Sequence, residues 1–299
     1  MSLLTLFSAP KPFTNPHINV IQRNALQSWL HLGPEVQVLL VGQEAGMDEV
    51  AAEYGVRLLP EVQRTEGGTP LVSSIFSLAR QASDSPFLGY VNGDILLLPD
   101  IVEATRQIAA QVNEPFLLIG QRWDLEVTEQ IDFSPGWERR LRAEAQDRGL
   151  LHRPAGSDYF VFPRSAFVEM PDFAIGRAGW DNWMIYHARQ QGWPVIDGTP
   201  AVMILHQNHD YSHLPGGKPH YDHQESQQNM ARAGGLANMY MVLDADRQLK
   251  DGRVQRPALT TTRSLRAIER WLMPKDGSLR GRRGALARRF RRMRRELYD

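Results

Sequence analysis

Short apolar runs alternate with longer amphipathic segments over the first 120 or so residues. The apolar runs are rich in branched and aromatic side chains, so they are predicted to be strands: LLTLFS, VQVLLVG, VRLLP, FLGYVNGDI and FLLIGQR. The segments between them repeat apolar residues at helical spacing and are predicted to be helices: HINVIQRNALQSWLHL, MDEVAAEYG, PLVSSIFSLARQAS and DIVEATRQIAAQV. Strands that alternate with helices predict an α/β fold whose mostly parallel sheet is covered on both faces.

The pattern is looser from about residue 121 to residue 215. Here SDYFVFPR is predicted to be a strand, DNWMIYHARQQG a helix capped by Asp181, and PVIDGTPAVMILH further strand. After about residue 255 the chain is basic and helical in its pattern. The sequence therefore predicts one α/β domain over residues 1–255 and a basic helical extension over residues 256–299.

One carboxylate interrupts the apolar run from Phe87 to Ile101. The run breaks at Asn92-Gly93-Asp94 and then resumes, and a buried carboxylate is costly unless it is paired, hydrogen-bonded or bound to a cation. Asn-Gly is a strong hairpin signal, so a simple turn is the alternative. Pro99-Asp100 and the segment after it predict a helix, however, which places Asp94 at the carboxyl end of a strand. Open α/β sheets bind their ligands there.

Composition narrows the class of protein. Of the 299 residues, 42% are hydrophobic and 23% are charged, as in ordinary soluble globular proteins. The sequence has no cysteine, which excludes disulfides, thiolate catalysis, zinc fingers and iron–sulfur clusters. A signal peptide is not expected, because MSLLTLFSAPKPF has no basic region before its apolar run, and no apolar run approaches the ~20 residues of a membrane span. We predict a cytoplasmic protein and leave peripheral membrane association open.

The formal net charge of zero conceals a strongly basic tail. Residues 280–299 hold nine arginines and two acidic residues, so the rest of the chain is mildly acidic. Leu286, Phe290, Met293 and Leu297 recur at helical spacing and share one face. Such a helix can lie in the interface of an anionic membrane; the alternative is a helix packed back onto the acidic body. Nucleic-acid binding is not expected, because aromatic residues are not interleaved with basic ones in the main domain.

Histidines concentrate in one segment. Five of the nine lie between residues 206 and 223, in HQNHDYSHLPGGKPHYDH. Imidazole is the commonest metal ligand at neutral pH, but H-E-x-x-H is not present in the sequence, so a zincin is not expected. One histidine and one aspartate brought together would suit a hard divalent cation that also holds phosphate oxygens. A polar surface loop is the alternative.

Three further segments carry groups that could bind a ligand. Glu66 to Leu71 is a glycine-rich turn into a helix, and helix N-termini bind phosphate. It matches neither common phosphate-loop motif, so a plain connection is the alternative. Ser8 to Pro12 ends the first predicted strand. Gly176 to Trp183 combines two tryptophans with Asp181, and such tryptophans are either core residues or the partners of a sugar ring beside a carboxylate.

Four segments together resemble the nucleotide-sugar glycosyltransferases of the glycosyltransferase-A fold, close to the uncharacterised glycosyltransferase-2-like group. They are FSAPKPF, YVNGDILL, GSDYFVFPR, and GRAGWDNWMIYHA followed by ILHQNHDYSH. The resemblance implies a single Rossmann-like glycosyltransferase-A domain followed by the basic extension. In this superfamily a D-x-D motif at a strand end holds a divalent cation on the donor diphosphate. A late histidine often completes that site, and an acidic residue at a helix start faces the acceptor.

By resemblance, Asp94 binds the metal, with Asn92 where a full D-x-D motif has its first aspartate. The late histidine is His206 or His209, and His206 is preferred because it follows the apolar run VMIL. Asp181 matches the acidic helix start and is the predicted general base. The predicted substrate-binding residues, with Asp158 assigned to the donor sugar, are Ser8, Pro10, Lys11, Thr69, Asn92, Asp158, Trp180 and Asn182.

The activity implied by the resemblance is transfer of a sugar, as by a hexosyltransferase, from a nucleotide-diphosphate sugar to a hydroxyl acceptor. We prefer a UDP-sugar donor, Mn²⁺ or Mg²⁺ as cofactor and an inverting reaction, while a retaining reaction and a glycan or lipid-linked glycan acceptor stay open. One alternative is a sugar-1-phosphate nucleotidyltransferase, which shares the fold but has a glycine-rich fingerprint where this chain has SAPKPF. The other alternative is a non-catalytic nucleotide-sugar-binding module.

Overall fold

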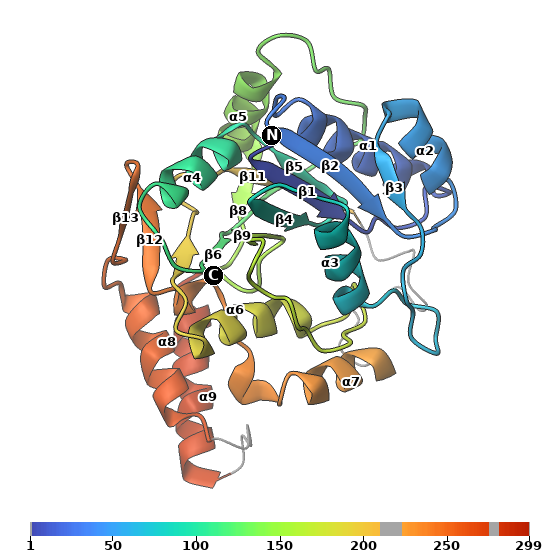
Figure 1. Ribbon diagram of the computed structural model, residues 1–299. Helices are drawn as coiled ribbons and strands as arrows, with labels where there is room; N and C mark the ends of the chain where they lie inside the picture. The colour runs from blue at the N-terminus through green and yellow to red at the C-terminus, as the bar shows by residue number, and fades with distance from the viewer. Residues whose placement is uncertain (1, 210–222, 275–280, 299) are drawn as a thin grey trace.

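A nine-stranded sheet forms the centre of the computed structural model, which describes residues 2–209, 223–274 and 281–298 (Figure 1). Its strands are β1 (Leu4–Ser8), β2 (Val36–Val41), β3 (Arg57–Leu59), β4 (Phe87–Val91), β6 (Leu117–Ile119), β9 (Tyr159–Pro163), β10 (Val195–Asp197), β12 (Arg247–Lys250) and β13 (Arg253–Gln255). Within the described residues the strand order is β13-β12-β10-β6-β9-β4-β1-β2-β3. Five of the eight neighbouring pairs are parallel, and β9 runs antiparallel between β4 and β6. The predicted α/β class with a mostly parallel sheet is confirmed.

Helices cover both faces of this sheet (Figure 1). They are α1 (Pro16–Leu30), α2 (Met47–Tyr54), α3 (Val72–Gln81), α4 (Asp100–Ala109) and α6 (Trp180–Gln190). Helix α7 (Gln224–Arg232) lies below α3 and α6 in Figure 1, and the short 3₁₀ turns η3 (Leu236–Asn238) and η4 (Val242–Asp244) follow it. Side chains alternate along β1, so Leu4 and Leu6 pack in the same core as Trp29 of α1, whereas Phe7 packs in the core of Phe76 of α3. Strands buried on both faces have continuous apolar sequences, which explains why their positions could be predicted.

A second, four-stranded sheet has the order β5-β11-β7-β8. Its strands are β5 (Ile95–Leu97), β11 (Ile204–Gln207), β7 (Trp123–Leu125) and β8 (Leu150–Leu151), and α5 (Trp137–Arg148) packs against it. The turn at Asn92-Gly93-Asp94 thus joins two different sheets and is not a hairpin, because β5 pairs with β11 and not with β4. The second sheet was not predicted, since its strands contain only two to four residues each.

Two other elements differ from the sequence predictions. Helix α6 begins at Trp180 with Gly179 in the left-handed conformation (φ 109°) at the N-cap, so Asp181 lies in the first turn and is not the cap. Strands β12 and β13 form an unpredicted hairpin whose turn residues, Asp251 and Gly252, both have positive φ. Asp-Gly is a common pair in such turns. This hairpin extends the sheet at its β10 edge.

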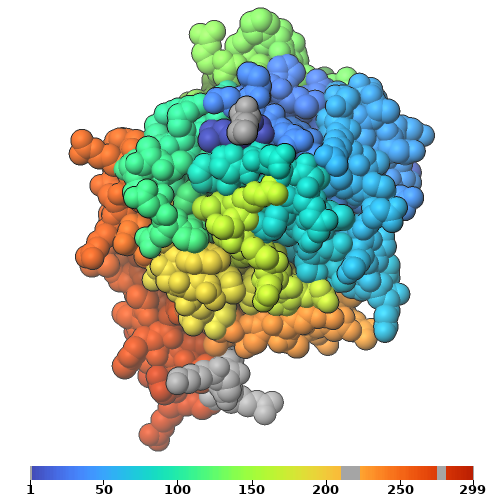
Figure 2. Space-filling model, viewed as in Figure 1, coloured from blue at the N-terminus to red at the C-terminus, as the bar shows by residue number. Residues whose placement is uncertain are grey.

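The basic extension folds as a helical hairpin. Helices α8 (Thr261–Leu272) and α9 (Gly281–Arg295) lie side by side at one end of the molecule, at the lower left of Figures 1 and 2. Glu269 of α8 is fully buried and accepts hydrogen bonds from Arg266, Arg291 and Arg294. The predicted basic helical tail is therefore present and is docked on α8. In the described part of the chain, every helix is too short or too polar to cross a bilayer.

Candidate active site

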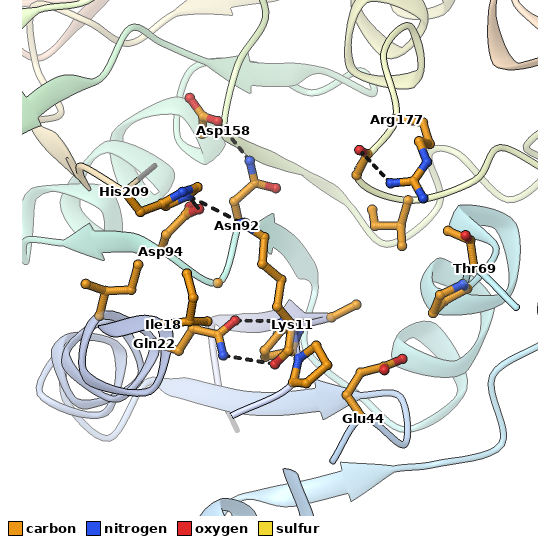
Figure 3. A pocket seen from close by; sticks show the side chains of 18 of the residues that line it. Lys11, Ile18, Gln22, Glu44, Thr69, Asn92, Asp94, Asp158, Arg177 and His209 are labelled. Atoms are coloured by element: carbon orange, nitrogen blue, oxygen red, sulfur yellow. Dashed lines mark hydrogen bonds and ion pairs between the residues drawn. The ribbon is translucent and has the colours of Figure 1, made fainter. Parts of the chain in front are cut away.

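A cavity of about 510 Å³ opens beside the carboxyl ends of β1 and β4 (Figure 3). These two strands are parallel neighbours, so β1 leads into Pro10 and Lys11 at the same edge of the sheet where β4 leads into the turn from Asn92 to Asp94. Thr69, from the turn before α3, and Arg177, from the segment before α6, lie across the cavity from this edge. The cavity thus occupies the position where open α/β sheets bind ligands.

Asp94, His206 and His209 converge at one end of the cavity. Each offers one possible metal-ligand atom, and these atoms lie within 4.8 Å of one another. Nε2 of His209 is 3.1 Å from Oδ2 of Asp94, and Nε2 of His206 is 3.9 Å from the same oxygen. Oδ1 of Asp94 is buried without a hydrogen-bond partner among the described residues. A bound cation would satisfy this oxygen, which is costly to bury alone.

The second sheet brings these three residues together from distant parts of the sequence. Strands β5 and β11 are antiparallel, with Ile95 opposite His206, and the backbone N–H of Gln207 donates to the carbonyl oxygen of Asp94 at 3.2 Å. His209 lies two residues after the end of β11. His213 and His220 of the histidine-rich segment lie outside the described residues.

Charged neighbours keep Asp94 ionised. Burial alone would raise its pKa, but the hydrogen bond from His209, the nearby imidazole of His206 and the positive charge of Lys11 lower the pKa below its ordinary value. Nζ of Lys11 lies 3.3 Å from Nε2 of His209, and burial lowers the pKa of this lysine while Asp94 raises it. An anionic carboxylate therefore lies next to a cationic amine, and this combination suits a cation together with a phosphate group.

Asn92 and Asp158 are linked beside this cluster. Nδ2 of Asn92 donates to Oδ1 of Asp158 at 2.8 Å, and Nη1 of Arg122 donates to the other oxygen of Asp158 at 3.0 Å. The hydroxyl of Tyr90 donates to Oδ1 of Asn92 at 3.1 Å. Both ends of the Asn92 amide are therefore engaged by protein groups, so this residue orients Asp158.

Lys11 is held in place through its backbone. Its N–H donates to Oε1 of Gln22 at 2.7 Å, and Nε2 of Gln22 donates to its carbonyl oxygen at 2.9 Å. Gly93 packs closely on the same loop, since a Cβ atom there would lie 3.3 Å from Cα of Pro10. Contacts this tight favour glycine at position 93. The ends of β1 and β4 are thus fixed relative to each other, and so are Lys11 and Asp94.

Eight of the twelve predicted site residues line the cavity: Pro10, Lys11, Thr69, Asn92, Asp94, Asp158, His206 and His209. The hydroxyl of Thr69 is already engaged, because it donates to Oε2 of Glu225 at 2.9 Å. The other four residues do not line the cavity: Ser8, Trp180, Asp181 and Asn182.

Three of these four are buried or hydrogen-bonded within the protein, and their role in substrate binding stays a prediction. Ser8 is fully buried in β1. Trp180 is 5% exposed, and its ring lies 5.1 Å from that of Tyr90 in the aromatic core under α6. Nδ2 of Asn182 donates to the carbonyl oxygen of Tyr240 at 2.6 Å. Trp180 is therefore a core residue, because surrounding side chains occupy the ring faces that a sugar would need.

Asp181 does not line the cavity, but it is close enough to Asp158, which does, to interact with its charge. Burial, followed by the negative charge of Asp158, raises the pKa of Asp181 to about 6, although backbone N–H groups at the start of α6 act in the opposite direction. Its Oδ2 lies against Gly156, where a Cβ atom would be only 1.9 Å away. Glycine at position 156 therefore makes room for this carboxylate. A carboxylate with a pKa near 6 is able to accept a proton at neutral pH.

The sequence predictions missed several residues of the site. Arg122, Gln22 and Arg177 line the cavity, and Asp124 lies 3.1 Å from His206. Arg122 could have been found, since it ends the predicted strand FLLIGQR much as Asp94 lies near the end of the predicted strand FLGYVNGDI. Asp124 carries no such signal, because its strand contains three residues and its pairing depends on the second sheet.

A scan of the sequence against protein-family models finds no match, and a search of the curated proteins finds none either. Solved structures give matches. One is glucosyl-3-phosphoglycerate synthase from Mycobacterium tuberculosis in complex with Mg²⁺ and UDP, with a TM-score of 0.48, 15% identity, and coverage of 79% of this chain and 80% of that chain. Another is a mannosyltransferase from Pyrobaculum calidifontis in complex with GDP-Man and Mn²⁺, with a TM-score of 0.46, 11% identity, and coverage of 77% and 62%. Each of these complexes contains a nucleotide or nucleotide sugar with a divalent cation.

Proposed function

We propose that this protein transfers a sugar from a nucleotide-diphosphate sugar to a hydroxyl acceptor. The observation that carries the proposal is the convergence of Asp94, His206 and His209 at the carboxyl edge of the parallel sheet, beside a cavity large enough for a nucleotide sugar. The unpartnered Oδ1 of Asp94 in this cluster supports a cation site. A UDP-sugar is the preferred donor.

The residues of the cluster fit Mn²⁺ or Mg²⁺. Asp94 would supply a carboxylate oxygen, and His206 and His209 would each supply Nε2. One carboxylate with two imidazoles favours Mn²⁺ over Mg²⁺, because Mg²⁺ prefers an all-oxygen shell. When bound, such a cation neutralises the negative charge that develops on the leaving diphosphate. Lys11 would contact the same phosphate groups from the end of β1.

Asp158 and Asp181 are assigned to the reacting sugars. Asp158 lines the cavity and is oriented by Asn92 and Arg122, which suits a carboxylate that accepts hydroxyl protons of the donor sugar. Asp181, with its raised pKa, would take the proton of the acceptor hydroxyl as the bond to the donor breaks. A general base on the acceptor side favours an inverting transfer.

A thermal-shift panel tests the donor and the cation together. We expect one nucleoside diphosphate, and its sugar nucleotide, to raise the melting temperature by roughly 5 °C at a hundredfold excess over Kd, because a ligand of the native state stabilises it by mass action. The rise should require Mn²⁺ and should be largest for the uridine compounds. A panel of UDP-, GDP- and ADP-sugars that leaves the melting temperature unchanged, with and without Mn²⁺, would contradict the proposed donor class.

We also propose that the α8–α9 hairpin binds an anionic membrane surface peripherally. Leu286, Met293 and Leu297 remain 41–53% exposed although α9 packs on α8, and Trp271 of α8 is 75% exposed. Arg283 packs on Trp271, with its Nη2 donating to the carbonyl oxygen of that residue at 3.0 Å. Five further arginines of α9 are exposed: Arg282, Arg288, Arg289, Arg292 and Arg295. Exposed apolar side chains, a tryptophan and basic residues on one hairpin are typical of a membrane-interface element.

Liposome co-sedimentation checks this surface. We expect binding to phosphatidylserine vesicles at low salt, release as the salt concentration rises, and no binding to neutral vesicles. Arg289→Glu with Arg292→Glu should weaken binding at least about tenfold, since each basic residue near the surface contributes about 1 kcal/mol. Point variants are preferable to truncation, because removal of α9 would leave the buried Glu269 without Arg291 and Arg294.

Leu150→Ser, at a 74% exposed position on β8, is the control. Equal binding by the double variant would rule out this surface.

A further inference from the structure

Acidic and imidazole side chains alternate across the second sheet. Its strands lie in the order β5-β11-β7-β8, and they carry, in that order, Asp94 just before β5, His206 on β11, Asp124 on β7 and His152 just after β8. His206 and Asp124 are direct cross-strand partners. The row thus extends from the proposed cation site to the opposite edge of the sheet, and its two outer members on that side, Asp124 and His152, do not line the cavity.

The distances along the row assign a role to each nitrogen of His206. Its Nε2 faces Asp94, 3.9 Å from Oδ2, and its Nδ1 faces Asp124, 3.1 Å from Oδ1, although off the line of a well-formed hydrogen bond. An imidazole that binds a cation through Nε2 must carry its hydrogen on Nδ1. A carboxylate beside Nδ1 stabilises that tautomer and fixes the direction of the ring.

Asp124 is itself held in place by two other side chains. Nε of Arg122 donates to its Oδ1 at 2.8 Å, and Nδ1 of His152 lies 2.7 Å from its Oδ2. The carboxylate is therefore held from two directions, and its Oδ1 lies beside Nδ1 of His206.

Arg122 donates hydrogen bonds to two carboxylates beside the proposed cation site. It joins Asp124 to Asp158, which accepts a hydrogen bond from Asn92, two residues before Asp94. Hydrogen bonds thus connect Asp124 to Arg122, Arg122 to Asp158, and Asp158 to Asn92. A network of this kind holds the ligand atoms in position before any cation arrives, which reduces the free energy needed to organise them on binding.

We propose that Asp124 is a positioning residue: it holds His206 in the Nδ1–H tautomer and so presents Nε2 to the cation. The inference rests on the proposed function, because it assumes the cation site of Asp94, His206 and His209. It adds a residue that does not touch the substrate or the cation and that lies on a strand which the sequence did not predict.

A titration of the full chain with Mn²⁺, without nucleotide, tests the proposal. The electron paramagnetic resonance signal of free Mn²⁺ reports how much of the ion is bound. Asp124→Ala should weaken Mn²⁺ affinity by roughly 10- to 100-fold, the range for loss of a partner of a metal-binding histidine. Asp124→Asn should lose less, because its amide oxygen can still accept the hydrogen of Nδ1. Asp100→Asn is the matched control: it removes a carboxylate that pairs with Arg142 at 2.7 Å outside the cavity, and it should leave Mn²⁺ affinity unchanged.

A second measurement reads the tautomer directly and does not depend on the stability of any Asp124 variant. Long-range ¹H–¹⁵N spectra of the metal-free protein near pH 8, with the His206 signals identified by their loss in His206→Gln, should show the hydrogen on Nδ1. Hydrogen on Nε2, or an Asp124→Ala protein that binds Mn²⁺ within about twofold of the wild type, would overturn the proposal. Failure of the wild type to bind Mn²⁺ would instead contradict the proposed cation site, and the tautomer would still decide the role of Asp124.

Discussion

Asp94→Ala is expected to lower the rate of sugar transfer by at least about three decades while the protein stays folded. Removal of this carboxylate takes away the anionic member of the Asp94, His206 and His209 cluster, and a catalytic cation contributes several kcal/mol to transition-state stabilisation. The affinity for nucleoside diphosphate should also lose its dependence on Mn²⁺. Steady-state release of the nucleoside diphosphate, combined with calorimetric titration with and without Mn²⁺, measures both effects.

Two variants separate this role from a general loss of stability. Asp84→Ala makes the same change at an exposed position in the loop between α3 and β4, and it should transfer sugar normally. Asp94→Asn keeps the shape of the side chain and removes its charge, so it should be inactive with a melting temperature closer to that of the wild type. Activity like that of the wild type in Asp94→Ala, or full activity in excess EDTA, would refute the assignment of Asp94.

Asp181→Asn is expected to lower kcat by roughly two to four decades, the range for loss of a general base, with little change in donor affinity. In the wild type kcat/KM should fall as the pH decreases below about 6, because Asp181 then becomes protonated. The variant should lose this limb of the pH profile. Asp246→Asn is the control. It removes a carboxylate that pairs with Arg189 of α6, the helix that also carries Asp181, and its pH profile should match that of the wild type.

The stability of Asp181→Asn provides an independent check. The folded protein holds the proton of Asp181 at a pKa of about 6, higher than the ordinary value of 3.8, so ionisation of this group disfavours the folded state. The stabilising contribution of the group is complete below about pH 4 and is lost as the pH rises through 6. Asparagine avoids this loss, so the variant should melt at the same temperature as the wild type or higher at pH 7.5. A variant that melts lower and turns over normally would show that Asp181 is a structural residue of α6.

The central sheet was predictable from the sequence because its strands are buried on both faces. Strands β1, β2 and β4 lie within the apolar runs that predicted them, and Asp94 drew attention because it interrupts one of those runs. Helix α5 was missed for the opposite reason. Its sequence, WERRLRAEAQDR, has few apolar residues, and it is anchored mainly through Trp137, Leu141 and Ala145.

The remaining site residues depend on packing that sequence patterns do not encode. Trp180 and Asp181 are adjacent in the sequence, yet the direction of α6 turns the ring into the core and the carboxylate toward Gly156. Asp124 and His206 are far apart in the sequence and meet through the pairing of β7 with β11. In the tail, the spacing of Leu286, Met293 and Leu297 predicted one apolar face of α9, and these side chains are exposed. Helix α9 packs on α8 through a different face, which carries Arg291 and Arg294 to Glu269.

The most direct measurement of the central claim is the release of free nucleoside diphosphate from sugar nucleotides. The purified protein would be incubated with Mn²⁺ and each of UDP-, GDP- and ADP-sugars, with simple sugars, glycans or lipid-linked glycans as hydroxyl acceptors. Asp94→Ala would serve as the control for contaminating hydrolases. Our account predicts release from one donor class, with UDP-sugars first, that depends on Mn²⁺, increases with an acceptor and is lost in Asp94→Ala. No release from any sugar nucleotide, together with release of pyrophosphate from a nucleoside triphosphate and a sugar 1-phosphate, would contradict it and identify a nucleotidyltransferase.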